Sequence, residues 1–249
     1  MAVNNIRSYL FVAALLVAST AQAQWSGKAE LGVIVSDGNT EAKSANTKLD
    51  LTHAGAVWTN NFYLAALYGE NAEFATAQRY EARYKADRQI TDKLSWFFAL
   101  RGEQDKFSGF AYQATASTGA TLKLIDAPGT KLDLSVGAGY RRLQPEVLLK
   151  SDAGEVLDRI KGEEESDVVA TVASNYEHDF TASTKITNKF LAEAGSDNTA
   201  LQNDVALQVS MTDVLALSVG IGVRYNTDPP PLSESTDTLF TVNLVYNIK

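Results

Sequence analysis

The sequence predicts an all-β fold, namely a transmembrane, antiparallel, up-and-down β-barrel of twelve strands. Three observations lead to this fold class. The chain begins with a segment built like a secretory signal. The remainder repeats an alternation of apolar and polar residues with a period of two. Short and long connections alternate between these runs. A length of 249 residues suits one such barrel.

The first 23 residues have the basic, apolar and small-residue order of a secretory signal. Arg7 is the only charged residue before Lys28, an apolar stretch follows over 9–18, and Ala21-Gln22-Ala23 supplies an A-x-A cleavage site. The apolar stretch is too short to span a bilayer, which needs about 20 residues. We therefore expect 1–23 to be a signal peptide cleaved between Ala23 and Gln24, which leaves 24–249 as the barrel.

The alternation is clearest over residues 79–88, where one face carries charges and the other carries tyrosine and alanine. No helical period gathers five charges on one face in this way. Similar runs predict strands at approximately 26–36, 42–53, 61–70, 78–89, 94–104, 112–124, 131–142, 166–178, 183–194, 200–210, 214–226 and 236–248. Ten or fourteen strands stay open as alternatives, because the runs 42–53 and 183–194 alternate weakly.

Strand length and connections favour a membrane barrel over a soluble one. The length of the runs is close to the roughly 9–11 residues that a tilted strand needs to cross a bilayer. It exceeds the roughly 5–6 residues of an average strand in a soluble protein. Short links such as 90–93 and 179–182 alternate with longer ones such as 143–165 and 227–235. Because barrels of this class have short periplasmic turns and longer external loops, both chain ends are expected to be periplasmic.

Energy sets which face meets lipid. An arginine or lysine facing lipid at mid-bilayer costs about 2–4 kcal/mol, so the charged faces must line the lumen. The predicted lumen-lining residues are Arg79, Glu81, Arg83, Arg101, Glu103, Asp133, Arg141, Asp204 and Arg224. Twelve strands enclose a backbone cylinder with a diameter of roughly 24 Å, and side chains reduce the free diameter to about 12 Å. Long charged side chains are able to close that gap.

Several short segments resemble one known family. They are Gly32 with Ser36-Asp37-Gly38-Asn39-Thr40, then Val136-Gly137-Ala138-Gly139-Tyr140-Arg141-Arg142, and finally Val242-Asn243-Leu244-Val245-Tyr246. The chain resembles the YdiY-like family of salt-induced outer-membrane proteins, which is grouped around a domain of unknown function. This resemblance implies a barrel in the outer membrane of a Gram-negative bacterium and a link to salt or osmotic stress. It implies no catalytic residues.

Two interpretations of the lumen stay open at this point. In the favoured one, paired charges form a plug that holds the barrel rigid and nearly occludes the lumen. In the alternative, the charges line a narrow channel for ions or small solutes. Glycines such as Gly137 and Gly220 fit both, because they leave room either for arginines or for solute.

The composition argues against other function classes. A net charge of −8 disfavours nucleic acid as a partner, and the absence of cysteine excludes a thiolate nucleophile. The two histidines, His53 and His178, fall beside predicted periplasmic turns, and the chain has no Gly-x-Ser-x-Gly motif. We therefore expect a monomer that is not an enzyme and binds neither cofactor nor metal. Its expected partners are outer-membrane lipid, lipopolysaccharide and, during insertion, the barrel-assembly machinery.

The predicted external loop 143–165 is the third candidate for function. It ends in the acidic run Glu163-Glu164-Glu165, which is typical of a solvated surface. An alternative is that the run collects divalent cations at the lipopolysaccharide surface, although its spacing matches no defined calcium loop. A further alternative is that this loop binds surface lipid or acts as an adhesin.

Overall fold

A computed structural model describes residues 24–36, 42–71, 73–152 and 154–248, so the expected signal peptide lies outside the described residues. The described residues form strands and no helix. None of them belongs to a helix long and apolar enough to span a bilayer. The strands are β1 Gln24–Ser36, β2 Ala42–Ala54, β3 Trp58–Asn71, β4 Ala75–Gln89, β5 Leu94–Asp105, β6 Phe110–Ala127, β7 Thr130–Lys150, β8 Val156–Lys161, β9 Glu165–Asp179, β10 Thr184–Ala194, β11 Thr199–Ser210, β12 Leu215–Asn226 and β13 Thr236–Ile248.

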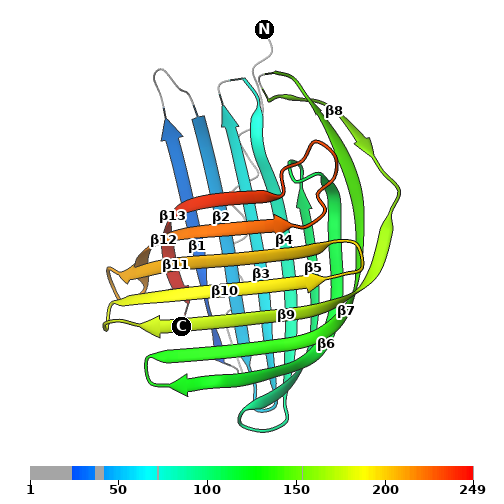
Figure 1. Cartoon of the computed structure of the whole chain (residues 1–249). Coiled ribbons are helices and arrows are strands. Elements are labelled where there is room, and N and C mark those ends of the chain that lie inside the picture. The colour runs from blue at the N-terminus through cyan, green and yellow to red at the C-terminus, as the bar shows by residue number, and fades with distance from the viewer. Residues whose placement is uncertain (1–23, 37–41, 72, 153, 249) are drawn as a thin grey trace.

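Twelve of these strands close into one antiparallel barrel. Each strand pairs with the next along the chain, β7 pairs directly with β9, and β1 pairs with β13 to complete the ring. The predicted twelve-stranded, antiparallel, up-and-down barrel is therefore confirmed, and every predicted run coincides with an observed strand. Strands on the two sides of the barrel cross steeply in Figure 1, as expected for strands tilted to the barrel axis.

The two ends of the barrel differ. The first residues of β1 and the last residues of β13 lie at one end, because Gly27 stands opposite Ile248. The links at this end are short, as between Ile90 and Leu94, where the Ile90 and Thr91 amides both donate to the Leu94 carbonyl. The longer connections, including residues 227–235, lie at the other end (Figure 1). We call the two ends the turn end and the loop end.

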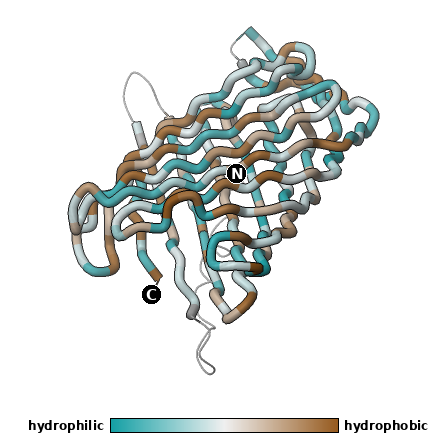
Figure 2. Tube along the Cα trace, turned by 60° about the horizontal axis from the view of Figure 1, so that its bottom comes forward, coloured by the Kyte–Doolittle hydropathy of each residue, from teal (hydrophilic) through white to brown (hydrophobic). Residues whose placement is uncertain are grey.

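The barrel is apolar outside and polar inside, the reverse of a soluble protein. Brown and teal alternate along the strands in Figure 2, as a period of two requires. Val168 and Phe240 face outward and are 72% and 71% exposed, whereas Arg141 and Asn243 face the lumen and are each 1% exposed. An exposed apolar belt of this extent marks a surface that lipid or protein covers.

The stretch 143–165, predicted as an external loop, is in part a β-hairpin, and this prediction is corrected. Strand β7 continues to Lys150, and β8 pairs back onto it from Glu146 opposite Lys161 to Lys150 opposite Val156. The physical reason is that alternation persists past residue 143, so Glu146 and Leu148 share one buried face. Gly154, with a φ of +89°, lies in the turn, where a glycine adopts this conformation freely.

Candidate functional site: the charged lumen

The lumen receives its charges from the alternate positions of neighbouring strands. In β4 and β5 the register places Glu81 opposite Glu103 and Arg83 opposite Arg101. Their outward-facing neighbours include Tyr80 and Leu100, which are exposed. Because successive side chains of a strand point to opposite faces, the pattern that puts tyrosine and leucine outside also forces these charges inside.

Glu81 is the central acid of the lumen. Its side chain is only 1% exposed and contacts three arginines. Arg83 Nη2 lies 2.6 Å and Arg101 Nε lies 3.1 Å from Glu81 Oε1, and Arg224 Nη2 lies 3.4 Å from Glu81 Oε2. Both carboxylate oxygens are therefore occupied by guanidinium groups, which are donors suited to this geometry.

Contacts of this group join opposite walls of the barrel. Arg101 on β5 donates from Nη1 to Glu193 Oε2 on β10, at 3.0 Å. Arg83 on β4 donates from Nη2 to the Gln202 side-chain oxygen on β11, at 2.7 Å. Strands β10 to β12 lie across the ring from β4 and β5. We call these residues the cross-lumen network: Glu81, Arg83, Arg101, Glu103, Glu193, Gln202 and Arg224.

The cross-lumen network is balanced in charge. Glu103 accepts from Arg101 and lies 3.8 Å from Arg224 Nε, and the Gln202 amide donates to it at 3.3 Å. Three arginines thus face three glutamates. Ions taken out of water are costly unless each is paired and hydrogen-bonded, so removal of one member is expected to be worse than removal of a matched pair.

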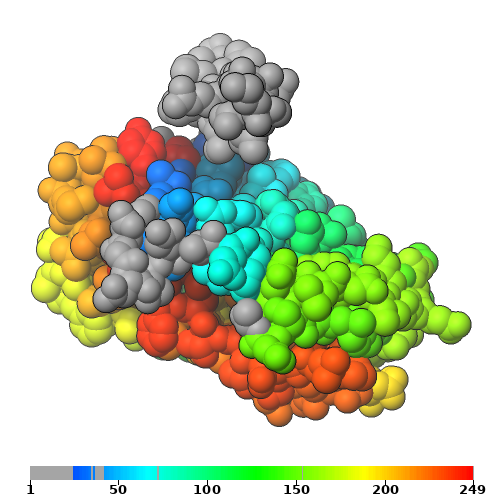
Figure 3. All heavy atoms as spheres, turned by 90° about the horizontal axis from the view of Figure 1, so that it is seen from above, coloured from blue at the N-terminus to red at the C-terminus, as the bar shows by residue number. Residues whose placement is uncertain are grey.

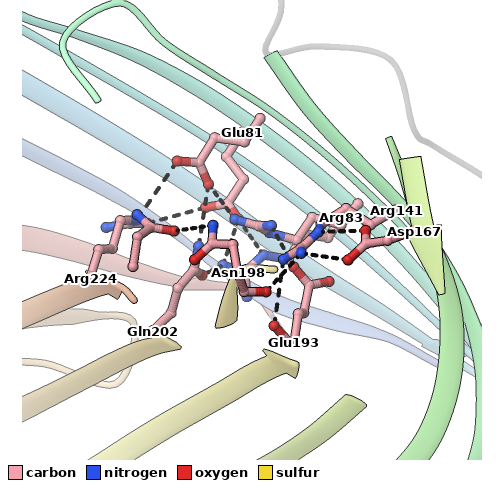
Figure 4. A network of polar contacts seen from close by, with 11 residues as sticks. Glu81, Arg83, Arg141, Asp167, Glu193, Asn198, Gln202 and Arg224 are labelled. Carbon is pink, nitrogen blue, oxygen red and sulfur yellow. Dashed lines mark hydrogen bonds and ion pairs between the residues drawn. The ribbon is translucent and has the colours of Figure 1, made fainter. Parts of the chain in front are cut away.

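A second arginine cluster lies along the wall nearer the loop end. Arg141 Nε and Nη2 donate to the two oxygens of Asp167 on β9, at 3.1 and 2.9 Å. The same guanidinium also donates to the backbone carbonyl of Asn198, at 2.8 Å, and reaches that of Glu193 at 3.5 Å. Figure 4 shows this bidentate ion pair of Arg141 and Asp167 beside the cross-lumen network. Arg141 therefore ties β7, β9 and the β10–β11 turn together.

Another set of charges lies toward the turn end. Lys189 on β10 reaches Asp50 on β2 at 2.6 Å, which is a further contact between walls. Asp50 also accepts from the Asn61 amide at 2.7 Å. A cavity of about 240 Å³ lies inside the barrel and is lined both by these residues and by the cross-lumen network.

The sequence-predicted lumen residues divide into two groups. Arg83, Arg101, Arg141, Arg224, Glu81 and Glu103 meet in the contacts described above. Arg79 lies apart from them, and its guanidinium is 3.9 Å from the Asp105 carboxylate. Asp204 lines the cavity, and Asp133 lies on the neighbouring wall opposite Lys123. None of these last three belongs to the cross-lumen network. Arg83 contacts an amide across the lumen, and its acid partner, Glu81, lies on its own strand.

Three partners of the predicted lumen arginines escaped the sequence analysis. Glu193 and Gln202 belong to the cross-lumen network, and Asp167 pairs with Arg141. A signal existed for each, because all three occupy the inward-facing register of predicted runs. The run containing Glu193 alternates weakly, since Leu191 shares its polar face, and this weakness obscured the position.

The loop end is crossed by the β12–β13 connection. The Thr227 amide donates to the Thr199 carbonyl at 3.1 Å, which ties the connection to the β10–β11 turn. Farther along, buried Pro230 and half-buried Ser233 lie against Gly109 of the β5–β6 turn on the opposite side of the ring. Seen from above in Figure 3, the red to orange atoms of this connection abut green atoms across the mouth. Residues 227–235 thus span the mouth.

The remaining candidates have structural contacts. His53 packs on Trp25 with ring centroids 4.9 Å apart, and His178 Nδ1 lies 2.8 Å from the Thr130 hydroxyl. In the acidic run of residues 163–165, Glu164 contacts Arg142 and accepts from the Tyr112 hydroxyl. Within the described ranges, no three His, Cys, Asp or Glu side chains gather as a metal site would require.

A closed ring of long antiparallel strands, apolar outside and charged inside, has the architecture of the outer-membrane β-barrel class. Within this class, the chain belongs to the family described as "Protein of unknown function, DUF481", whose model matches residues 29–248. The chain is 20% identical over 231 residues to "Uncharacterized protein YdiY" of Escherichia coli strain K12. The match covers 92% of this chain and 86% of that relative. The predicted YdiY-like family is therefore confirmed.

Solved structures similar to this chain include two porins. The NanC porin is 10% identical with a TM-score of 0.47, and the match covers 90% of this chain and 100% of that one. The KdgM porin is 12% identical with a TM-score of 0.43, and the match covers 91% of this chain and 100% of the porin chain.

Proposed function

We propose that this protein is a monomeric, non-enzymatic outer-membrane barrel whose lumen is nearly occluded by charged side chains. The observation that carries the proposal is the cross-lumen network, in which Arg101 meets Glu193 and Arg224 meets Glu81 between opposite walls. A solute that follows the barrel axis must separate these ion pairs. Separation leaves buried charges unpaired, which costs about 3–5 kcal/mol for each broken pair.

The apolar outer belt supports a membrane location for the barrel. Exposed valine, leucine, phenylalanine and tyrosine side chains recur on the outward face of nearly every strand. In water such a belt would aggregate, whereas lipid covers it without cost. Outer-membrane lipid and lipopolysaccharide are the partners of this belt, the assembly machinery inserts the barrel, and residues 1–23 direct its export.

A physiological role follows from the mechanics of a filled barrel. Salt screens exposed charges far more than buried pairs, so a network buried in the lumen keeps its strength when external ionic strength rises. A rigid, nearly closed barrel is therefore suited to an envelope under salt or osmotic stress, and we propose this role for the protein.

The second candidate function is a narrow channel for ions or small solutes. One observation favours it, namely the cavity of about 240 Å³ beside the network, which Lys189, 41% exposed, partly lines. In this alternative the network acts as a constriction instead of a plug.

Conductance in planar lipid bilayers separates the two functions. The purified protein is expected to produce no discrete current steps in 1 M KCl, whereas Arg101→Ser/Glu193→Ser, which removes one matched pair, produces them. A variant with the same substitutions on the hairpin outside the barrel, Arg159→Ser/Glu146→Ser, is the control and stays silent. Salt-dependent steps from the unmodified protein establish the channel and overturn the plug.

A further inference from the structure

The outer surface near the turn end carries one arginine between two tryptophans. Arg88 on β4 stands opposite Trp58 on β3 and opposite Trp96 on β5. The two indole side chains face outward and are 49% and 53% exposed, and Arg88 is exposed as well. Residues directly opposite each other on antiparallel strands have Cβ atoms about 4.5–5.5 Å apart. Arg88 therefore projects between two indoles, at the end of the barrel wall where membrane barrels carry aromatic residues.

Arg88 has no partner within the described part of the protein. No acid lies within ion-pair distance of its guanidinium there, and no atom accepts a hydrogen bond from it. Its neighbour in the chain, Asp87, faces the lumen and pairs with Lys85 at 2.9 Å. An arginine stays charged and carries five N–H donors, so the binding capacity of this side chain is unused.

The outward-facing cations near the loop end differ in this respect. Arg142 contacts Glu164, and Lys43 Nζ lies 4.0 Å from a carboxylate oxygen of Glu70. Each of these cations has an acid of the protein beside it. The charge of Arg88 is not balanced in this way, so an anion from outside the protein is the partner that its chemistry calls for.

The polar side chains around this arginine are engaged, with one exception. The Trp96 indole N–H donates to the Thr118 hydroxyl at 2.9 Å. The Tyr84 hydroxyl donates to the Asn60 side-chain oxygen at 2.9 Å. Among the described residues, the indole N–H of Trp58 finds no acceptor. The free groups are thus N–H donors on two neighbouring strands, which favour an anionic ligand that accepts hydrogen bonds.

An apolar surface continues from Arg88 toward the middle of the outer belt. Ala86 also points outward, yet it is only 7% exposed, because larger side chains surround it. Phe98 stands directly opposite Ala86 on β5 and is 45% exposed. A ligand held at Arg88 therefore has a charged contact at one end and apolar contacts beside it, as an amphipathic molecule requires.

We infer that Arg88, Trp58 and Trp96 form a binding site for the head group of an anionic glycerophospholipid in the leaflet at the turn end. Arg88 binds the phosphate, and the Trp58 indole N–H donates to a second head-group oxygen. The acyl chains extend over Ala86 and Phe98. Charge complementarity selects an anionic lipid, because a zwitterionic head group brings its own cation to the phosphate. The inference rests on the proposed membrane location but not on the lumen being closed.

Quenching of tryptophan fluorescence by brominated lipids tests the site. Trp25→Phe removes the third tryptophan of the chain, so both remaining indoles flank Arg88. This protein is placed in vesicles of phosphatidylcholine and phosphatidylglycerol, in which one lipid or the other carries bromine on its acyl chains. We expect phosphatidylglycerol to associate with the indoles about fivefold more strongly, which is the contribution of one arginine near a membrane surface. Equal association of the two lipids overturns the inference.

Two substitutions show whether Arg88 causes the preference. Arg88→Gln keeps a hydrogen-bonding side chain without the charge, and we expect the preference for phosphatidylglycerol to disappear. Arg142→Gln is the control, since it removes an outward-facing cation near the other end of the barrel and should leave the preference unchanged. A preference that survives Arg88→Gln, or that both substitutions abolish, contradicts the site.

Inorganic phosphate distinguishes a lipid site from a site for a free anion. At constant ionic strength, an excess of phosphate should leave the preference for phosphatidylglycerol in place, because soluble phosphate gains no contact with the apolar surface. Loss of the preference in phosphate overturns the choice of a lipid as the ligand.

Heat-modifiable migration on gels, measured on every sample, keeps the two proposals separate. An unmodified protein that never yields a folded barrel in vesicles defeats the proposed membrane function. A folded barrel that shows no preference between the two lipids defeats only the head-group site.

Discussion

Arg101 of β5 and Glu193 of β10 form an ion pair at 3.0 Å, although 92 residues separate them in the chain. The pair joins two walls that share no backbone hydrogen bond. Closure of the sheet into a ring brings these walls within reach, and side chains then add a connection through the centre. The barrel is thus held both around its circumference and across its lumen.

Glu81→Gln tests the importance of the central acid. The substitution leaves three arginines without their shared anion, and removal of one partner of a buried ion pair costs about 3–5 kcal/mol. We expect the free energy of unfolding, measured by urea titration in liposomes, to fall by about this amount. Glu164→Gln, on the exposed surface, is the matched control and should leave the unfolding midpoint in place. Equal midpoints for the two variants would contradict the role assigned to Glu81.

Val219→Arg tests which surface meets lipid. An arginine on the outward face of a membrane barrel costs about 2–4 kcal/mol near mid-bilayer. We expect the same urea titration to show a loss of this size. The control is Leu157→Arg on β8, which is also an exposed apolar residue but lies on the hairpin beyond the barrel. If the two variants unfold alike, the outer belt does not face lipid.

Gly109→Ala tests the contact across the mouth. A Cβ at Gly109 would lie 2.3 Å from Ser233 Oγ, and the glycine has a φ of +81°. We expect faster amide hydrogen exchange over residues 227–235, because the connection loses its support on the β5–β6 turn. Gly154→Ala is the control, since its φ is +89° but no atom lies within 4 Å of the added carbon. Backbone strain is therefore common to both variants, and only the first should loosen this connection.

Export gives a prediction at the N-terminus. The exported protein should begin at Gln24, which the intact mass of material purified from outer membranes will show. Ala23→Phe removes the small residue required before the cleavage point, so the uncleaved form should accumulate. Ala13→Phe keeps the apolar stretch apolar and should be processed normally. An exported protein that retains Arg7 would contradict the assigned signal.

The sequence was sufficient for the architecture because a period of two is a local property. The charges around Arg83 and the tyrosines beside them identify a strand, its two faces and the face that meets lipid, without knowledge of any distant residue. The alternation over about ten consecutive residues is enough to predict the strand Ala75–Gln89 and the inward orientation of Glu81.

Partners across the lumen could not be predicted in this way. Whether Arg101 meets Glu193 or Asp204 depends on the stagger of the ring and on its diameter, which are properties of all the strands together. The short ladder between β1 and β13 escaped for the same reason, since the alternation in β1 continues past Leu31, where this ladder stops. The hairpin was missed because residues 143–165 were interpreted as one external loop, although the strand continues to Lys150.

The extension of β7 has a consequence for the shape of the loop end. Strand β6 begins at Phe110, opposite Pro145, so the hairpin of β7 and β8 stands beyond the rim on one side only. Among the described residues, this hairpin therefore extends the wall of the barrel past the ladder that β7 shares with β6 and β9. Leu157 and Arg159 lie on this projection, away from the ring of paired strands.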